Sequence, residues 1–190
     1  MATKPGERKA QILQILAEML EDPKGEKITT ALLAAKVNVS EAALYRHFSS
    51  KAQMFEGLIE FIESTVFSLI NKIMVEETSG VKQIEAVISM LLGFAKKNPG
   101  MTRVLIGDAL VHENEKLQAR INQLHDRLEA TLRQSLRLAA SVNEIPNNTD
   151  TTIKANVLLC YVIGRWHQFA KSGLKRSPTE YWPAQMAELL

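Results

Sequence analysis

The amino-acid sequence predicts an all-α fold of about nine helices. A small N-terminal head of three helices is joined through a long fourth helix to a larger helical body. Apolar residues recur at intervals of three and four along almost the whole chain, as they do on the buried side of helices. No stretch of alternating apolar and polar residues is bounded by turn signals, as a strand would be. Hydrophobic residues make up 46% of the chain and charged residues 23%, which are the proportions of a folded globular protein.

Turn-forming residues set the ends of the predicted helices. The expected helices cover residues 7–20, 30–36, 41–47, 51–76, 81–97, a short segment after residue 100, and residues 113–139, 152–171 and 178–190. Asp22-Pro23-Lys24-Gly25 ends the first helix and Asn98-Pro99-Gly100 ends the fifth, because proline and glycine together cannot continue a helix. A polar loop at residues 141–150 follows the seventh helix, whose apolar residues form a seam of bundle type. The boundary between head and body falls inside the fourth helix and divides the chain into residues 1–53 and 54–190.

Helix caps mark the short helices of the head. Thr29 and Ser40 stand where their hydroxyl oxygens can accept a free amide of an opening helical turn. Asn38 lies between these two helices, and asparagine tolerates the left-handed backbone that such a helix end requires. Ser50 and Gln53 are spaced as a capping box for the long fourth helix. The sequence therefore predicts a helix, a very short turn, a second short helix and then a long helix.

Bulk properties exclude several classes of protein. No stretch approaches about 18 uninterrupted apolar residues and the N-terminus has no apolar run for an export signal, so a cytoplasmic protein with no membrane span is expected. The net charge is +2, and residues 1–55 contain eight basic and six acidic groups, so charge alone does not predict nucleic-acid binding. The single cysteine, Cys160, lies in an apolar run and is interpreted as a small core residue. No metal-ligand spacing, cofactor motif or catalytic motif is present, so no metal, cofactor or enzymatic activity is expected.

The segment at residues 28–48 contains two helices of about seven residues, which are too short to be stable alone. They must pack on the first and fourth helices, and the apolar residues available for this are Leu33, Ala34, Val37, Leu44 and Phe48. The solvent side of the second short helix then presents small and polar groups, as a recognition helix does to a major groove. Residues 1–53 are therefore predicted to be a helix-turn-helix DNA-binding domain. The candidate DNA-binding residues are Thr29, Thr30, Ser40, Glu41, Ala42, Ala43, Tyr45, Arg46, His47 and Lys51.

These candidates divide by the part of the duplex that they can contact. Direct reading of bases is expected from Thr29, Thr30, Ser40, Glu41 and Arg46. The two alanines can contact thymine methyl groups but cannot hydrogen-bond a base edge, so the shape of the DNA must contribute to recognition. Contacts to phosphates are expected from Tyr45, Arg46, His47 and Lys51. The base sequence that is recognised stays open.

The residues of this segment resemble those of TetR-type regulators. The signature consists of Leu44, Tyr45 and Phe48, with Lys51 three residues further on. Further matches to the nucleoid occlusion members of this family are LIEFIE at residues 58–63, LLGF at 91–94, Asn98-Pro99-Gly100 and LQARINQL at 117–124. The sequence departs from the general TetR pattern at four positions, namely Asn38, Ala42, Ala43 and Ser49.

The resemblance implies a TetR-like fold and a particular function. Nucleoid occlusion members of the family bind chromosomal double-stranded DNA as dimers at palindromic sites and antagonise assembly of the division GTPase FtsZ over the nucleoid. A homodimer associated with the nucleoid, with DNA and FtsZ as partners and no small-molecule ligand required, is the expectation. A ligand-responsive transcriptional repressor is the alternative. That alternative requires a pocket of several hundred Å³ with convergent polar groups inside the helical body.

Two predicted helices carry residues that do not fit a buried stripe. On the fourth helix Phe61 points away from the inner stripe, and on the fifth helix Gly93 lies on an outer side, where a glycine costs roughly 1 kcal/mol relative to alanine. Such a glycine suggests that another chain approaches the backbone closely. With the resemblance, these residues imply a groove for the FtsZ tail formed by Phe61, Met90, Gly93, Lys97 and Asn98. The alternative is that neighbouring elements of the body bury both helices on all sides.

The C-terminal helices carry more apolar residues than two terminal helices normally bury in a monomer. This surplus predicts a four-helix interface between two copies of residues 54–190, which form the dimerisation and partner-binding domain. The predicted interface residues are Leu158, Tyr161, Val162, Trp166, Phe169, Trp182 and Met186. The alternative is that Trp166 or Trp182 stacks on a bound ligand. A dimer also supplies the second recognition helix that a palindromic site requires.

Overall fold

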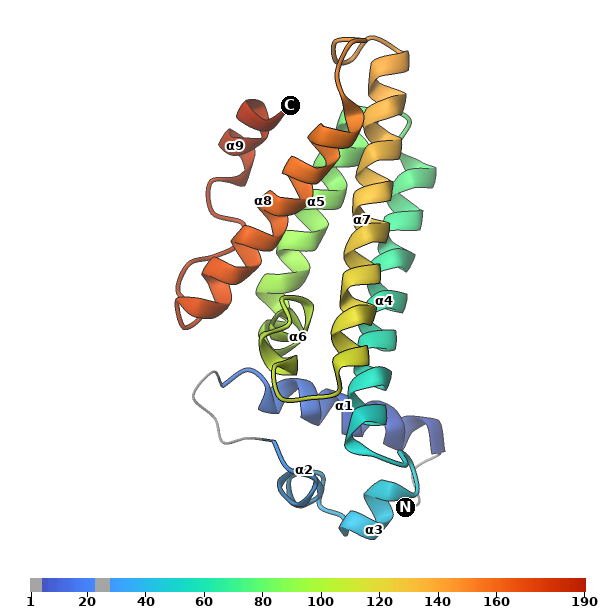
Figure 1. The fold of residues 1–190 in the computed structure, drawn as a ribbon, viewed down its shortest axis with the longest axis vertical. Coiled ribbons are helices and arrows are strands. Elements are labelled where there is room, and N and C mark those ends of the chain that lie inside the picture. Colours follow the sequence, from blue (N-terminus) through green and yellow to red (C-terminus); the bar gives the residue numbers. More distant parts are fainter. Residues whose placement is uncertain (1–4, 23–27) are drawn as a thin grey trace.

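The computed structural model describes residues 5–22 and 28–190, and it confirms an all-α fold within these ranges (Figure 1). Its helices are α1 (Pro5–Met19), α2 (Thr30–Val37), α3 (Glu41–Tyr45), α4 (Lys51–Glu76), α5 (Gly80–Lys97), α6 (Pro99–Leu105), α7 (Glu115–Ser141), α8 (Thr151–Lys171) and α9 (Trp182–Leu189), with a short 3₁₀ turn, η1 (Asp108–Leu110). Among the described residues there are thus nine α-helices and no strand, as predicted. None of the helices described is long and apolar enough to cross a lipid bilayer.

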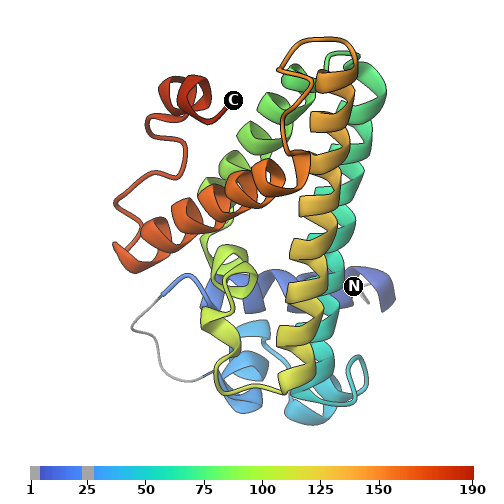
Figure 2. The same ribbon diagram turned by 45° about the horizontal axis from the view of Figure 1, so that its top comes forward.

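The body is a bundle in which α7 packs against α5 and α8, and α4 packs against α5 and α7. The helices α4 and α7 run side by side for most of their length, whereas α8 crosses the bundle obliquely (Figure 1; Figure 2). The head lies at one end of the molecule, where α1 runs across the base of the bundle and contacts both α4 and α6. The position of the head is therefore set by the continuous helix α4 and by the contacts of α1 with α6.

The caps predicted for the head are present. The Thr29 hydroxyl oxygen accepts the amide of Leu32, and that of Ser40 accepts the amide of Ala43, each at 3.1 Å. Asn38 adopts the left-handed conformation with φ 57° and ψ 52°, and ends α2. The capping box differs in one detail, because the Gln53 side chain accepts the amide of Ser49 instead of that of Ser50.

The last helix begins later than predicted, at Trp182 instead of residue 178. The cause is Arg165 of α8, whose guanidinium donates hydrogen bonds to the backbone carbonyls of Ser177, Pro178 and Glu180. Carbonyls held in this way are directed toward α8 and not along a helix axis. Helix α3 is also shorter than predicted, ending at Tyr45 instead of residue 47.

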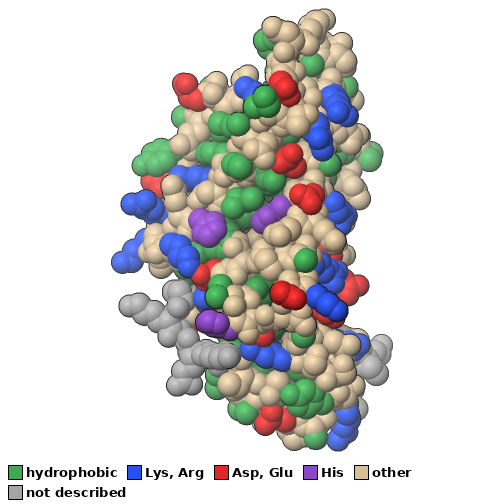
Figure 3. Space-filling view, viewed as in Figure 1, with side chains coloured by type: hydrophobic (Ala, Val, Ile, Leu, Met, Phe, Trp, Pro, Cys, Tyr) green, Lys and Arg blue, Asp and Glu red, His purple; other side chains and the backbone are tan. Residues whose placement is uncertain are grey.

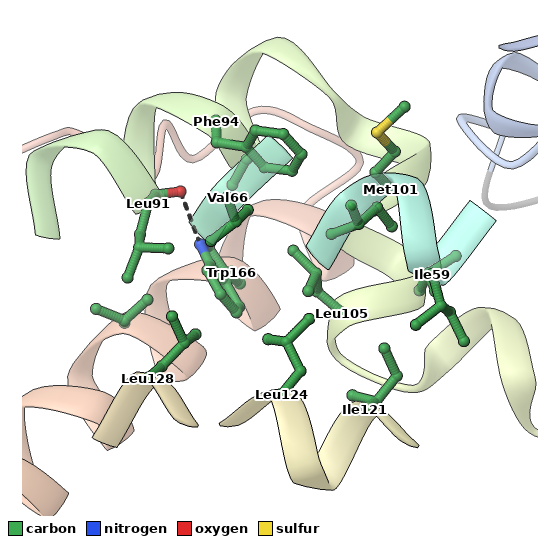
Figure 4. Close-up of a cluster of buried hydrophobic side chains, with 14 of the residues drawn as sticks. Ile59, Val66, Leu91, Phe94, Met101, Leu105, Ile121, Leu124, Leu128 and Trp166 are labelled. Carbon is green, nitrogen blue, oxygen red and sulfur yellow. Dashed lines mark hydrogen bonds between the residues drawn. The ribbon is translucent and has the colours of Figure 1, made fainter. Parts of the chain in front are cut away.

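Buried apolar side chains form one core that extends from the head into the body. The predicted seam of α7 is fully inside it and consists of Leu117, Ile121, Leu124, Leu128, Leu132 and Leu136. Trp166 of α8 lies at the centre of the core, where its indole N–H donates to the Leu91 carbonyl at 3.2 Å (Figure 4). The imidazole of His125 lies 6.2 Å from the Trp166 ring, measured between centroids. Burial lowers the pKa of His125, so this histidine is neutral at physiological pH.

Candidate DNA interface

Helices α2 and α3 form the predicted helix-turn-helix. The turn between them is closed by Asn38, while the Val39 amide donates to the Ala34 carbonyl at 3.0 Å. Leu33, Val37 and Leu44 are buried beneath the two helices, whose contacts to α1 and to each other hold them in place. Helices this short depend on such packing. The structure therefore presents α3 at the end of the molecule farthest from the C-terminus (Figure 1).

The outward side of α3 carries most of the residues predicted to bind DNA. Ser40, Glu41, Ala42, Tyr45 and Arg46 are exposed. Three further candidates, Thr30, Ala43 and His47, are half-buried. On the face shown in Figure 3, acidic and basic side chains are interspersed over the head instead of forming a single basic field. This agrees with the nearly balanced charge of the head and leaves recognition to the shape and side chains of α3.

Two of the predicted base-reading residues contact each other. The Thr30 hydroxyl at the start of α2 donates to the Glu41 carboxylate at the start of α3, at 2.8 Å. A carboxylate at the beginning of a helix is favoured by the helix dipole. The hydrogen bond orients Glu41 and joins the two helices of the motif on their exposed side. Residues eleven positions apart show no local pattern, so the sequence did not reveal this pair.

The structure changes the prediction for Lys51. Its ammonium group forms an ion pair with Glu113, in the segment before α7, with 2.5 Å between Nζ and Oε1. The two side chains are only 23% and 13% exposed, and the Lys51 ammonium also lies 5.6 Å from the centre of the Phe55 ring. The sequence suggested that Lys51 is free to bind a phosphate. In the structure it is instead paired with Glu113. A phosphate contact by Lys51 would have to compete with the carboxylate of Glu113.

Removing the competing carboxylate is expected to strengthen DNA binding. In the Glu113→Gln variant, Lys51 becomes available to a phosphate, so affinity should rise about fivefold at low salt and the slope of log K against log salt should steepen by about one. Fluorescence anisotropy with labelled duplex over a range of salt concentrations measures both quantities. The matched control is Glu115→Gln, which removes the same charge from an exposed residue. Equal salt slopes in the two variants would show that Lys51 does not reach the DNA.

The residues predicted for a partner groove lie on the neighbouring helices α4 and α5. Phe61 is 48% exposed, an unusual value for a phenylalanine in a long helix of the body. A Cβ added to Gly93 would meet no atom within 4 Å, so the backbone there is accessible. Met90 is half-buried, Lys97 is exposed, and Asn98 ends α5 by donating to the Phe94 carbonyl at 2.8 Å.

A pocket of about 320 Å³ borders Phe61 at the junction of head and body. It is lined by Ala10, Gln11, Leu13, Gln14, Leu58, Phe61 and Met101, which belong to α1, α4 and α6. None of the predicted residues of α5 lines it, so this pocket does not unite the five groove residues. Its position at the junction also differs from the pocket inside the body that the ligand-responsive alternative requires.

An exposed leucine on α4 was missed by the sequence reasoning. Leu69 is exposed two turns after Phe61, and their side chains are about 80° apart around the helix axis. By helical spacing, Leu69 lies at the edge of the buried stripe that contains Ile62, Val66 and Ile70. Together with Val75, which is 84% exposed near the end of the helix, α4 carries three exposed large apolar side chains.

Most of the residues predicted for the dimer interface are covered by the protomer itself. Leu158, Val162 and Trp166 have no accessible surface, because α8 packs them against α5 and α7. Phe169, Trp182 and Met186 are also buried, and the half-buried Tyr161 donates its hydroxyl hydrogen to Gln185 at 2.8 Å. Their apolar surface thus needs no partner, which corrects the prediction. The same burial leaves no room for a ligand stacked on Trp166.

The opposite side of α8 is the one that remains uncovered. Its residues recur at intervals of four and three, as in a helix-packing seam, and are Ile153, Val157, Cys160, Gly164 and His167. Ile153 is 64% exposed and Val157 45% exposed. A Cβ added to Gly164 would meet no atom within 4 Å. Cys160, interpreted from the sequence as a core residue, is exposed here. We call these five residues the α8 seam.

Comparison with known proteins assigns the two parts of the chain separately. Residues 26–58 match the family model described as bacterial regulatory proteins of the tetR family. Residues 78–190 match a SlmA-like model described as a tetracyclin repressor-like C-terminal domain. The first match covers α2 and α3, and the second covers α5 through α9.

Curated relatives match nearly the whole chain. A nucleoid occlusion factor SlmA of Alteromonas mediterranea is 53% identical over 186 residues, which cover 98% of this chain and 95% of that protein. A nucleoid occlusion factor SlmA of Idiomarina loihiensis is 49% identical, with 97% of this chain and 94% of that protein covered. Identity at this level over nearly full length shows a common family.

Solved structures with the same fold are more distant in sequence. The fatty acid degradation regulator FadR of Bacillus halodurans superimposes with a TM-score of 0.82 at 15% identity, covering 99% of this chain and 97% of that chain. A TetR transcription regulator of Haloarcula marismortui gives a TM-score of 0.82 at 14% identity, with 97% and 96% covered. These similarities confirm the predicted TetR-like fold.

Proposed function

This chain belongs to the SlmA nucleoid occlusion factors of the TetR family, and from that premise we propose that it binds palindromic DNA as a dimer and antagonises FtsZ assembly over the nucleoid. It is a DNA-binding protein and not an enzyme. The observation that carries the proposal is the combination of an outward-facing α3 with an exposed Phe61 and an accessible Gly93 in one protomer. Such a protomer can contact DNA at one end and a protein partner along its body.

DNA contacts are assigned by side-chain chemistry. Ser40, Glu41 and Arg46 are exposed on α3 and carry hydrogen-bonding groups that suit base edges or phosphates. Tyr45 projects from the last turn of α3, where its hydroxyl suits a phosphate. Ala42 offers a methyl contact without a hydrogen bond. Since few side chains can read bases, the sequence preference should depend in part on the shape of the duplex.

The α8 seam is the proposed dimer contact. Its small residues, Cys160 and Gly164, lie in the middle of the helix and allow two α8 helices to approach closely, while Ile153 and Val157 supply apolar surface. Closed two-fold pairing of identical surfaces is the commonest way in which soluble proteins form dimers. In such a dimer the heads carry two copies of α3 for the two halves of a palindrome.

The proposed FtsZ contact lies on the outward sides of α4 and α5. Phe61 and Met90 supply apolar anchors of the kind that dominates binding energies. The backbone at Gly93 is open to an approaching chain, and Lys97 can pair with an acidic group of that chain. The exposed Leu69 extends the apolar surface along α4. A peptide lying in this groove would be separated from the DNA contacts of α3 by the length of the head.

Phe61→Ala and Lys97→Ala are each expected to weaken binding of an FtsZ tail peptide by at least about tenfold. The reason is that each removes an anchor of the groove, and fluorescence anisotropy with labelled peptide measures the change. The control is Lys175→Ala, which removes an exposed lysine that lies outside α4 and α5. Affinity for DNA should be unchanged in all three variants, because none of these residues is among the proposed DNA contacts.

Co-sedimentation tests the function itself. Wild-type protein with DNA is expected to reduce the amount of FtsZ polymer in the pellet, and the Phe61→Ala variant is expected to leave it unchanged. Normal peptide binding by both groove variants would disprove the groove. An undiminished FtsZ pellet with wild-type protein and DNA would contradict the proposed antagonism.

A further inference from the structure

A chain of charged residues connects the head to the C-terminal end of α8. Arg103 of α6 donates from one guanidinium nitrogen to the backbone carbonyls of Leu20 and Asp22, at 2.9 and 3.1 Å. Its Nε donates to the carboxylate of Asp108 in η1 at 2.7 Å. The other oxygen of Asp108 pairs with Lys171, the last residue of α8. Four segments of the chain thus meet around two side chains.

The first contact holds the end of α1. The last carbonyls of a helix have no partner within the helix, and Arg103 supplies one from the body. Next to it, the backbones of α1 and α6 touch, since a Cβ added to Gly100 would come within 1.9 Å of the Ala17 carbonyl oxygen. The joint between head and body is therefore closely packed at this point. A shift of α1 against α6 would break the Arg103 hydrogen bonds.

The second contact holds Asp108. Burial acts to raise the pKa of this carboxyl, but hydrogen bonds and charge from Lys171 and Arg103 outweigh that effect and hold the pKa below its usual value. The Arg103 and Asp108 side chains are only 15% and 17% exposed, so water screens their pairing weakly. The C-terminal ends of α1 and α8 lie on the same side of the molecule (Figure 1; Figure 2).

We infer that Arg103 and Asp108 are positioning residues for DNA binding, which lock the head to α8 and so set the spacing of the two recognition helices. The inference rests on the proposed dimer, in which α8 is the pairing helix. The two halves of a palindrome are about 34 Å apart, so both copies of α3 fit only when each head is held at the correct angle. A head free to tilt would still bind one half-site and would fit the whole palindrome poorly.

The test compares a complete palindrome with its parts. Four duplexes are used, all derived from a site selected for binding to the full-length protein. They are the palindrome, a single half-site, the palindrome with one base pair inserted at its centre, and the palindrome with two. Two variants are compared. Asp108→Asn removes the negative charge that pairs with both Arg103 and Lys171. Lys171→Ala removes only the ion pair between Lys171 and Asp108. The control is Glu76→Gln, which removes the same charge as Asp108→Asn from an exposed ion pair.

For Asp108→Asn we expect about a tenfold loss of affinity for the palindrome, while affinity for the half-site stays within about twofold of the wild-type value. The loss of affinity caused by the inserted base pairs should be smaller in this variant than in the wild type. Lys171→Ala should show the same pattern with about a threefold loss. Because Lys171 is 61% exposed, this variant leaves the core intact even if Asp108→Asn reduces stability. Glu76→Gln should bind all duplexes as wild type does.

Two results would overturn this inference and leave the proposed function standing. In the first, both variants prefer the palindrome to the half-site as strongly as the wild type does, and the inserted base pairs weaken their binding as much as they weaken wild-type binding. The other is an equal loss on the half-site and the palindrome, which would indicate damage to the head itself. If wild-type protein does not prefer the palindrome to the half-site, dimeric binding fails and the inference fails with it.

Discussion

Replacing Val157 by glutamate is expected to make the protein monomeric and to lower its affinity for a palindromic site by about 100-fold. Val157 is 45% exposed in the α8 seam, so the protomer tolerates a carboxylate there. In a dimer paired through this seam, the carboxylate would be buried without a partner. A monomer engages one half-site at a time and loses the gain in affinity that comes from binding two half-sites together.

Sedimentation velocity measures the oligomeric state, and anisotropy with the palindrome and the half-site measures DNA affinity. Val75→Glu is the matched control, because Val75 is 84% exposed at the end of α4 and lies outside the seam. A second variant, Gly164→Leu, fills the accessible space at the centre of the seam while improving helix propensity by roughly 0.8 kcal/mol. Dimers that persist in both seam variants would place the interface elsewhere.

Replacing Trp166 by alanine is expected to lower the free energy of unfolding by about 3–5 kcal/mol. The side chain is completely buried among the leucines of α5 and α7, so its removal leaves a large cavity (Figure 4). Since many domains unfold with only about 5–15 kcal/mol, this is a substantial part of the total stability. The free energy of unfolding is measured by urea denaturation monitored by circular dichroism.

The variant Trp166→Phe keeps an aromatic ring in the core but loses part of the indole volume together with the hydrogen bond to Leu91, so its destabilisation should be smaller than that of Trp166→Ala. Because dimerisation contributes to apparent stability, each variant is measured at several protein concentrations. If Trp166 acts in the core of the protomer, Trp166→Ala should lower the free energy of unfolding at every protein concentration. A variant with normal stability but weakened dimerisation would instead support the original assignment of Trp166 to the interface.

Most of the head could be predicted because its determinants are local. Thr29 and Ser40 cap amides three residues away, and Asn38 closes its turn through neighbouring backbone groups. Such contacts depend only on residue type and spacing, which the sequence displays directly. The same holds for the ends of α5 and α7, where proline, glycine and asparagine interrupt the helical pattern.

Contacts between distant residues were not predictable in this way. Lys51 was expected to be free for a phosphate, yet it pairs with Glu113, 62 positions further along the chain. The Arg103 hydrogen bonds to the end of α1 span more than 80 positions. Periodicity shows that a residue lies on a helix face but not which charged group of another helix lies opposite.

Helix α8 shows which properties follow from the local sequence and which depend on tertiary packing. Its sequence alone determines that it is a helix with apolar residues on more than one side, because helical spacing and its Asp150 cap are local properties. Only the packing of α5 and α7 decides that Leu158, Val162 and Trp166 are covered while Val157 and Gly164 are not. Burial is a property of the assembled bundle, since the same apolar side chain is stabilised equally well by a neighbouring helix of its own chain or of another.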